Sequence, residues 1–277
     1  IFAYDGSSWT QEDKIQASDP GQHDYFGWSV SMSSDGTKVL VGAYGEDTGA
    51  YNAGSAYIFA YDGSSWSQEA KIQSSDIYTS DFFGWSVSMN SDGTKVLVGA
   101  YAQDTGGSST GAAYTFAYDC SSWTQEAKIQ ASYPEASDYF GISVSMNSDG
   151  TKVIVGAHYE DTSAGNAGSA YIFAYDGSSW TQEDKIQASD IEAGDLFGNS
   201  VSMNSDGTKV IVGAYFEDTG GAQAGSAYIF AYDGSSWTQE AKIQSSDIAA
   251  GHGGSDFFGW SVSMNSDGTK VLVGAYA

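Results

Sequence analysis

Apolar and polar residues alternate over residues 26–32, where phenylalanine, tryptophan and valine are each followed by glycine or serine. A period of two is typical of a β-strand with one apolar face. An Asp-Gly turn at 34–37 leads to residues 38–44, which are nearly all apolar and predict a strand buried on both faces. The pattern therefore predicts a hairpin of two strands, which we name strand type A and strand type B.

A second hairpin follows after a loop. Residues 55–61 predict a third strand, type C, and Asp62-Gly63-Ser64-Ser65 predicts a tight turn. Residues 66–72 predict a polar fourth strand, type D, of the kind found at the edge of a sheet, where charges discourage further pairing. No segment shows a convincing helical period.

The four strand types recur along the chain. Type A begins near Phe26, Phe83, Phe140, Phe197 and Phe258, at intervals of 57, 57, 57 and 61 residues. A fixed period of this size indicates a repeat architecture. We expect an all-β fold, a five-bladed β-propeller with four antiparallel strands per blade, as a single domain over residues 1–277. Residues 1–16 supply types C and D, so we expect them to pair with the last A and B strands and close the ring. A parallel β-helix is the alternative.

The glycines inside these strands carry a family resemblance. The relevant pairs are Phe26-Gly27 with Val41-Gly42-Ala43, and Phe197-Gly198 with Val212-Gly213-Ala214. They resemble FG-GAP repeats, the blades of integrin α-subunit propellers and of many secreted or surface proteins. The resemblance implies a propeller fold and a secreted or cell-surface location.

Three features depart from that family. The final proline of its motif is tyrosine or histidine here, and seven blades are usual where we count five. Its calcium loop between strands A and B is shortened to Asn90-Ser91-Asp92-Gly93. One aspartate cannot supply the roughly six to eight oxygens that calcium takes, so we expect no calcium at these turns.

Charge limits the classes of partner. The chain has 35 acidic residues against 10 lysines and no arginine, with a formal charge of −25. This disfavours nucleic acid and anionic membranes, whereas cations, basic proteins and neutral sugars are compatible; solubility alone is an equal explanation. No long apolar stretch predicts membrane insertion. The single cysteine, Cys120, excludes an internal disulfide and falls on a turn.

The D–A and B–C loops lie at one end of a propeller, which we name the loop face. They vary between repeats while the tight turns are nearly identical, so we expect the loop face to bind the partner. We also expect it to hold acidic residues and no lysine. Aspartates recur there at Asp24, Asp47, Asp81, Asp104, Asp138, Asp161, Asp195, Asp218 and Asp256. They are candidate ligands for a divalent cation such as Ca²⁺, or else each caps its own turn.

Aromatic residues suggest a ligand platform at the same end. The position after Phe-Gly is occupied in the five repeats by Trp28, Trp85, Ile142, Asn199 and Trp260. These are the candidate ligand-binding residues, because tryptophan faces at the mouth of the channel suit a sugar ring; ordinary packing between blades is the alternative. A further tryptophan begins each D strand, and there we expect packing between blades.

Catalytic motifs are absent from the sequence. His23, His158 and His252 are isolated, and no metal, phosphate-loop or nucleophile-elbow motif is present. Five-fold repetition also suggests structural rather than catalytic carboxylates. We therefore expect no enzyme but an extracellular binding or adhesion module for a glycan or a protein. The alternative is a structural repeat unit of an extracellular assembly. A catalytic role would need a unique polar cluster, and only Tyr133, His158 and Asn199 depart from the repeat in that direction.

Overall fold

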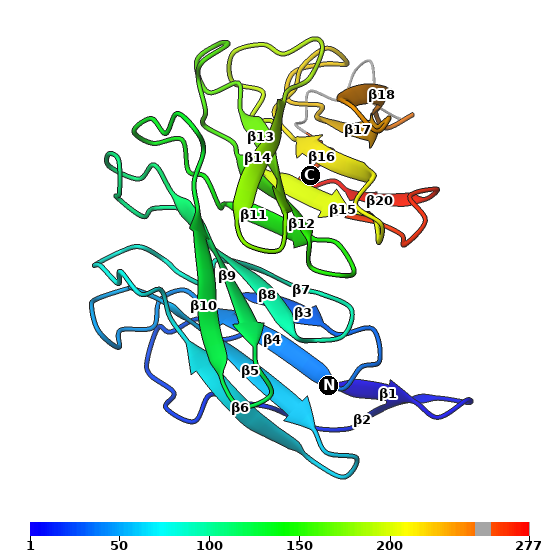
Figure 1. Cartoon of the computed structure of the whole chain (residues 1–277). Helices are drawn as coiled ribbons and strands as arrows, with labels where there is room; N and C mark the ends of the chain where they lie inside the picture. Colours follow the sequence, from blue (N-terminus) through cyan, green and yellow to red (C-terminus); the bar gives the residue numbers. More distant parts are fainter. Residues whose placement is uncertain (247–255, 277) are drawn as a thin grey trace.

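The computed structural model describes residues 1–246 and 256–276, which form twenty β-strands and no helix (Figure 1). Four antiparallel sheets each hold four strands in the order A-B-C-D. The first sheet contains β3 (Ser29–Met32), β4 (Lys38–Ala43), β5 (Ser55–Tyr61) and β6 (Trp66–Ile72). The second contains β7 (Ser86–Met89), β8 (Lys95–Ala100), β9 (Ala112–Tyr118) and β10 (Trp123–Ile129). The third contains β11 (Ser143–Met146), β12 (Lys152–Ala157), β13 (Ser169–Tyr175) and β14 (Trp180–Ile186). The fourth contains β15 (Ser200–Met203), β16 (Lys209–Ala214), β17 (Ser226–Tyr232) and β18 (Trp237–Ile243).

The sheets follow one another as the blades of a propeller. The A strands contact each other in succession, β3 with β7, β7 with β11 and β11 with β15, so they lie innermost. Apolar side chains from the facing sides of two adjacent sheets fill each junction. For example, Leu40 and Ile58 of the first sheet pack against Val96 and Val98 of the second. The all-β propeller predicted from the repeat is confirmed.

The two ends of the chain form separate two-stranded sheets. These are β1 (Phe2–Tyr4) with β2 (Trp9–Gln11), and β19 (Ser261–Met264) with β20 (Val271–Gly274). Figure 1 shows the two hairpins on the same side of the molecule with a gap between them. The predicted pairing that closes the ring is therefore not present between these described strands, and it stays a prediction.

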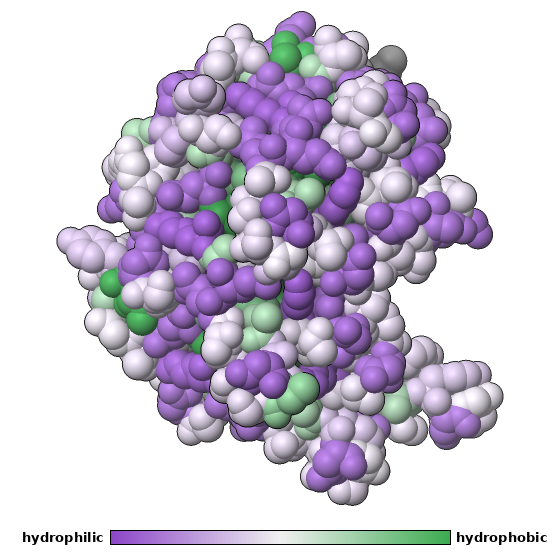
Figure 2. Space-filling view, viewed as in Figure 1, coloured by the Kyte–Doolittle hydropathy of each residue, from purple (hydrophilic) through white to green (hydrophobic). Residues whose placement is uncertain are grey.

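A hollow marks this gap. It has a volume of about 490 Å³ and is lined by Ile1 and Ile15 beside the N-terminal hairpin and by Phe26, Val30, Met32 and other residues of the first repeat. Figure 2 shows the molecule hollowed on this side. Leu272 on β20 is 74% exposed, whereas its equivalents Leu40, Leu97, Ile154 and Ile211 are fully buried at the other four junctions. At the open junction the equivalent apolar residue is thus present but left uncovered.

The structure explains why the Phe-Gly and Val-Gly pairs contain glycine. A Cβ atom added at Gly42 would collide with the carbonyl oxygen of Gly84 in the next sheet. The Ser29 hydroxyl donates a hydrogen bond to that same oxygen at 2.9 Å. Gly84 itself has a φ of +90°, which a side chain disfavours. Glycine is required at both positions because two backbones meet there.

The D strands join neighbouring sheets through a glutamate. In the four complete sheets the D strand carries a β-bulge at this residue, which is Glu69 in the first sheet. Glu69 accepts hydrogen bonds from Lys38 of its own sheet (3.1 Å) and from the indole nitrogen of Trp123 in the next (2.7 Å). The Lys38 ammonium also lies over the ring of Tyr118. We name this arrangement the bulge clamp. It explains the tryptophan that begins β6, β10, β14 and β18, which bonds a glutamate of the preceding repeat.

Candidate functional site

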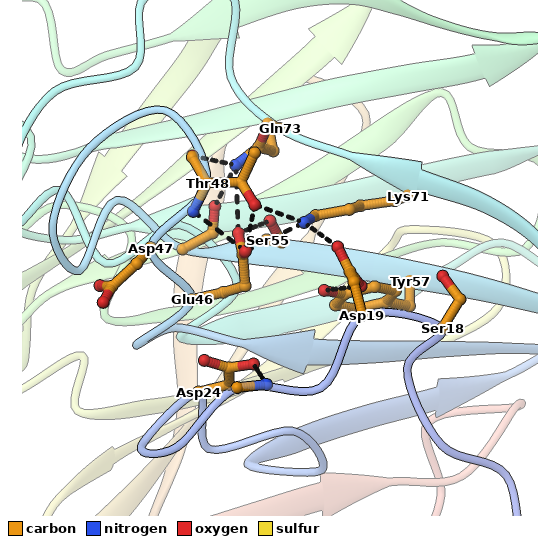
Figure 3. Close-up of polar contacts among 12 residues, drawn as sticks. Ser18, Asp19, Asp24, Glu46, Asp47, Thr48, Ser55, Tyr57, Lys71 and Gln73 are labelled. Atoms are coloured by element: carbon orange, nitrogen blue, oxygen red, sulfur yellow. Dashed lines mark hydrogen bonds and ion pairs between the residues drawn. The ribbon is translucent and has the colours of Figure 1, made fainter.

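The B–C loop is held by a buried glutamate (Figure 3). Glu46 is 4% exposed and accepts hydrogen bonds from the Ser55 hydroxyl at 2.7 Å and from the backbone of Thr48 at 3.0 Å. Lys71 reaches from strand D to Glu46 at 3.0 Å and to Asp19 of the D–A loop at 2.6 Å. One lysine therefore ties the two loops together.

This lysine corrects an expectation. Strand-D lysines extend to the loop face, which we expected to hold none; they are Lys71, Lys128, Lys185 and Lys242. In the second repeat Gln103 stands in place of the glutamate, and Lys128 binds Asp76. In the third Tyr133 stands in place of the aspartate, and Lys185 binds the glutamate. Each of the four lysines keeps at least one carboxylate, so part of the acidity is neutralised within the fold.

The aspartates before Phe-Gly bind their own loops. Those at 24, 81, 138 and 195 are buried, and each accepts a hydrogen bond from the backbone nitrogen three residues earlier, as in Tyr78 to Asp81 (2.8 Å). Burial raises the pKa of Asp81, Asp138 and Asp195 to about 6, with neighbouring carboxylates adding to the shift. This is the turn-capping arrangement. Asp256 is partly buried.

The aspartates of the B–C loop behave similarly in two repeats. Asp47 accepts from the backbone of Asn52 and Asp104 from the backbone of Ser109, each at 2.7 Å. Asp161 and Asp218 are exposed. Over residues 1–246 and 256–276, no three acidic, histidine or cysteine side chains are placed to hold a metal ion. The geometry supports turn capping, and calcium binding stays a prediction.

Aromatic rings form a nearly continuous row at the loop end of the A strands. Trp28 and Trp85 lie 4.8 Å apart, Tyr44 contacts both, and Trp85 continues to Tyr101 at 4.7 Å. We name this row the aromatic belt. Its members are Tyr25, Trp28, Tyr44, Phe82, Trp85, Tyr101, Tyr139, Tyr159, Tyr215, Phe216, Phe257, Trp260 and Tyr276.

Part of the aromatic belt consists of residues whose backbone has a left-handed conformation. The residue before Phe-Gly has positive φ in every repeat, at Tyr25 (55°), Phe82 (56°), Tyr139 (58°), Leu196 (58°) and Phe257 (48°). Such a conformation costs about 1–3 kcal/mol for a residue with a side chain and persists only where its surroundings enforce it. Tyr25 stacks on Tyr44 with ring centroids 4.7 Å apart. The signal in the sequence was an aromatic residue in four of the five repeats, which our reasoning missed.

The five predicted ligand-binding residues differ in their exposure and in their contacts with this belt. Trp28 is 52% exposed and Trp260 is 45% exposed, while Trp85 is half-buried. Ile142 is half-buried beside the belt, and its backbone nitrogen donates to the carbonyl of Tyr139. Asn199 lies beside Trp260 and donates to its backbone oxygen at 3.2 Å. Packing between blades and an accessible ring face are therefore combined in the same tryptophans.

One polar pair interrupts the belt. His158, after β12, lies with its Nδ1 atom 3.1 Å from the Oδ1 atom of Asn199, before β15. Tyr139 and Tyr159 contact the imidazole, with ring centroids at 5.9 and 4.3 Å. Burial lowers the pKa of His158 to about 4. The third odd residue, Tyr133, is 86% exposed on the D–A loop. The sequence singled out these residues but gave no sign that two of them meet.

The repeats match a family model throughout. The model described as the FG-GAP repeat matches residues 9–59, 66–116, 123–173, 180–230 and 237–277. The chain belongs to the FG-GAP repeat family. A search of curated proteins finds no match to this FG-GAP chain. Over the described ranges, none of its segments is a helix long and apolar enough to cross a membrane.

A solved structure supports the fold of this FG-GAP protein. It is a periplasmic gluconolactonase of Pseudomonas aeruginosa, with a TM-score of 0.61 and 15% sequence identity over 99% of this chain and 71% of that chain. This match corrects the expectation that the FG-GAP chain is not an enzyme. The expectation rested on missing motifs and on repetition, yet a protein of similar fold is named as an enzyme. The fold therefore does not exclude catalysis.

Proposed function

We propose that this FG-GAP propeller binds a glycan at the aromatic belt of its loop face. The observation that carries the proposal is the group of partly exposed tryptophan rings at one end of the A strands, Trp28, Trp85 and Trp260. Ligand sites are mostly apolar and aromatic with a few placed polar groups. A sugar ring offers an apolar face to such rings and hydroxyls to the polar groups around them.

Charge and strain support this choice. The chain has a formal net charge of −25, which suits a neutral sugar and disfavours an anionic polymer. Strained backbone of the kind seen at Tyr25 and Phe82 clusters at ligand clamps in proteins. We place the protein outside the cytoplasm, secreted or at a surface. Assistance by a divalent cation is the part of the proposal that the calcium arm of the test decides. A basic protein segment is the competing ligand.

The test uses a substitution that the chain itself provides. Trp85→Ile introduces the residue found at the equivalent position 142, so the apolar bulk stays and the aromatic face is lost. A glycan array, followed by calorimetric titration, measures binding with and without calcium. We expect Trp85→Ile to weaken sugar binding about tenfold, in line with the worth of an aromatic contact.

Trp9→Ala is the matched control, because Trp9 is 71% exposed on β2 and lies outside the belt. Unchanged affinity in Trp85→Ile, or an equal loss in Trp9→Ala, would refute the belt as the site. Assembly at rising protein concentration without sugar binding would favour the structural repeat unit. Hydrolysis of gluconolactone by the parent, lost in Trp85→Ile, would assign the belt to an enzyme.

A further inference from the structure

We propose that His158 is the polar specificity determinant of the belt, accepting at Nε2 a hydrogen bond from a hydroxyl of the bound sugar. This inference rests on the proposed function, since it assumes that the belt holds the ligand. Its basis is one junction between sheets that differs from the others.

The junction between the third and fourth sheets is the polar one. Four repeats place tyrosine at the end of strand B, and only the third places His158 there. Asn199 occupies a position that holds tryptophan or isoleucine in the other repeats. The two residues come from adjacent sheets and meet at 3.1 Å. At this junction an imidazole and an amide therefore meet within a belt of aromatic rings.

Hydrogen bonds fix which nitrogen carries the proton. The Asn199 amide nitrogen donates to the backbone oxygen of Trp260, which orients the amide oxygen toward the imidazole. Because that oxygen can only accept, Nδ1 of His158 must donate. Burial keeps the imidazole neutral near pH 7. The Nε2 atom is then left with a lone pair and acts only as an acceptor.

This acceptor has no hydrogen-bond partner among residues 1–246 and 256–276. His158 is 8% exposed, and its Nε2 atom is one of four buried side-chain atoms in the described ranges without a hydrogen bond. A buried acceptor left unpaired is unfavourable, so a donor that reaches it recovers a hydrogen bond. The contacting rings of Tyr139 and Tyr159 are only half-buried. Rotation of these rings is the movement that would admit a ligand hydroxyl.

A single buried imidazole acceptor has consequences for the ligand. Five equivalent sites would bind several sugars, but one acceptor selects one orientation of one sugar per chain. It also selects against analogues that lack the hydroxyl, because the nitrogen then stays buried and unpaired. The ligand class is a neutral polyhydroxylated ring.

His158→Tyr is the decisive variant, since tyrosine fills this position in the other four repeats. Calorimetry would use D-glucose, D-galactose and D-mannose, their methyl glycosides and the monodeoxy analogues. The parent should bind with a stoichiometry of one and lose about tenfold in affinity for one monodeoxy analogue. His158→Tyr should bind the full sugar about tenfold more weakly and no longer distinguish that analogue.

The outcomes separate the two proposals. A loss in Trp85→Ile with unchanged discrimination in His158→Tyr overturns only the role of His158. No sugar binding by the parent overturns the proposed function and this inference with it. If His158→Tyr does not fold, ¹⁵N spectra of the three histidines replace it: a shift of the His158 Nε2 resonance on saturation with sugar supports the proposal, and an unchanged resonance overturns it.

Discussion

Replacing the buried glutamate Glu217 by glutamine should cost stability in a pH-dependent way. Glu217 is 2% exposed, and it accepts hydrogen bonds from the Ser226 hydroxyl at 2.6 Å and from Lys242 at 2.9 Å. Burial alone would raise its pKa, but the hydrogen bonds from Ser226, Thr219 and Lys242 outweigh burial and hold the pKa at about 2. The second repeat carries Gln103 at this position, buried and bonded to its own loop, so glutamine fits the space.

The magnitude follows from the difference in pKa between the folded and unfolded states. A carboxyl that moves from 4.5 to about 2 contributes about 3 kcal/mol at neutral pH, at about 1.4 kcal/mol per pH unit. Because the folded pKa is the lower one, this stability is complete above pH 4.5 and is lost as the pH falls toward 2. Glu217→Gln should therefore destabilise the protein by about 2–3 kcal/mol at pH 7 and by only about 1 kcal/mol at pH 3.

Urea unfolding at pH 7, 5 and 3 measures this difference in the free energy of unfolding. Asp218→Asn is the control, because Asp218 is an exposed acid on the same loop and should change little. A loss below about 0.5 kcal/mol at pH 7, or an equal loss at pH 7 and pH 3, would show that the carboxylate is not held as the structure indicates.

Three further results are expected. Gly156→Ala should prevent folding or lower the free energy of unfolding by about 4 kcal/mol or more, because the added Cβ would collide with the carbonyl oxygen of Gly198. The control is Gly165→Ala, whose added Cβ would contact no other atom and which should leave thermal unfolding nearly unchanged. Asp138 has a raised pKa of about 6, so its ionisation destabilises the fold as the pH rises through 6; Asp138→Asn should be more stable than the parent at pH 7.5 by about 1–3 kcal/mol and equal to it at pH 4 in urea. Calcium titration of chelator-treated protein should give no saturable heat if the carboxylates remain bonded to their own loops, and saturable binding would restore the metal site.

The repeat pattern predicted most of the fold because the order of apolar and polar residues in each strand shows which of its faces is buried. The alternation from Phe26 and the Asp-Gly turns gave strand types, turns and blade count. The meeting of two backbones at Gly42 and Gly84 was seen only in the structure. Contacts between blades were harder to predict. The reach of Lys71 to the loop face depends on the spacing between strand D and two loops, which residue type alone does not encode.

The candidate site was predicted in its position and not in its composition. Tryptophans such as Trp85 were expected at the loop face, but the left-handed residues that complete the belt were missed because positive φ is not expected of tyrosine or phenylalanine. The pairing of His158 with Asn199 joins residues 41 positions apart on different sheets. Such a pair becomes visible only once the order of the blades around the axis is known.

The bulge clamp has a consequence for how such proteins change over evolutionary time. Nearly the same glutamate, lysine and tryptophan join each sheet to the next, as in Glu69 with Trp123 and Glu183 with Trp237. Each closed junction therefore accepts any repeat as its neighbour, and stability depends on adjacent pairs. Unequal recombination between the DNA copies would exchange, add or delete whole repeats while leaving each surviving junction with equivalent partners. Blade number can then drift without the invention of a new interface, and a new ligand site needs changes at one junction only.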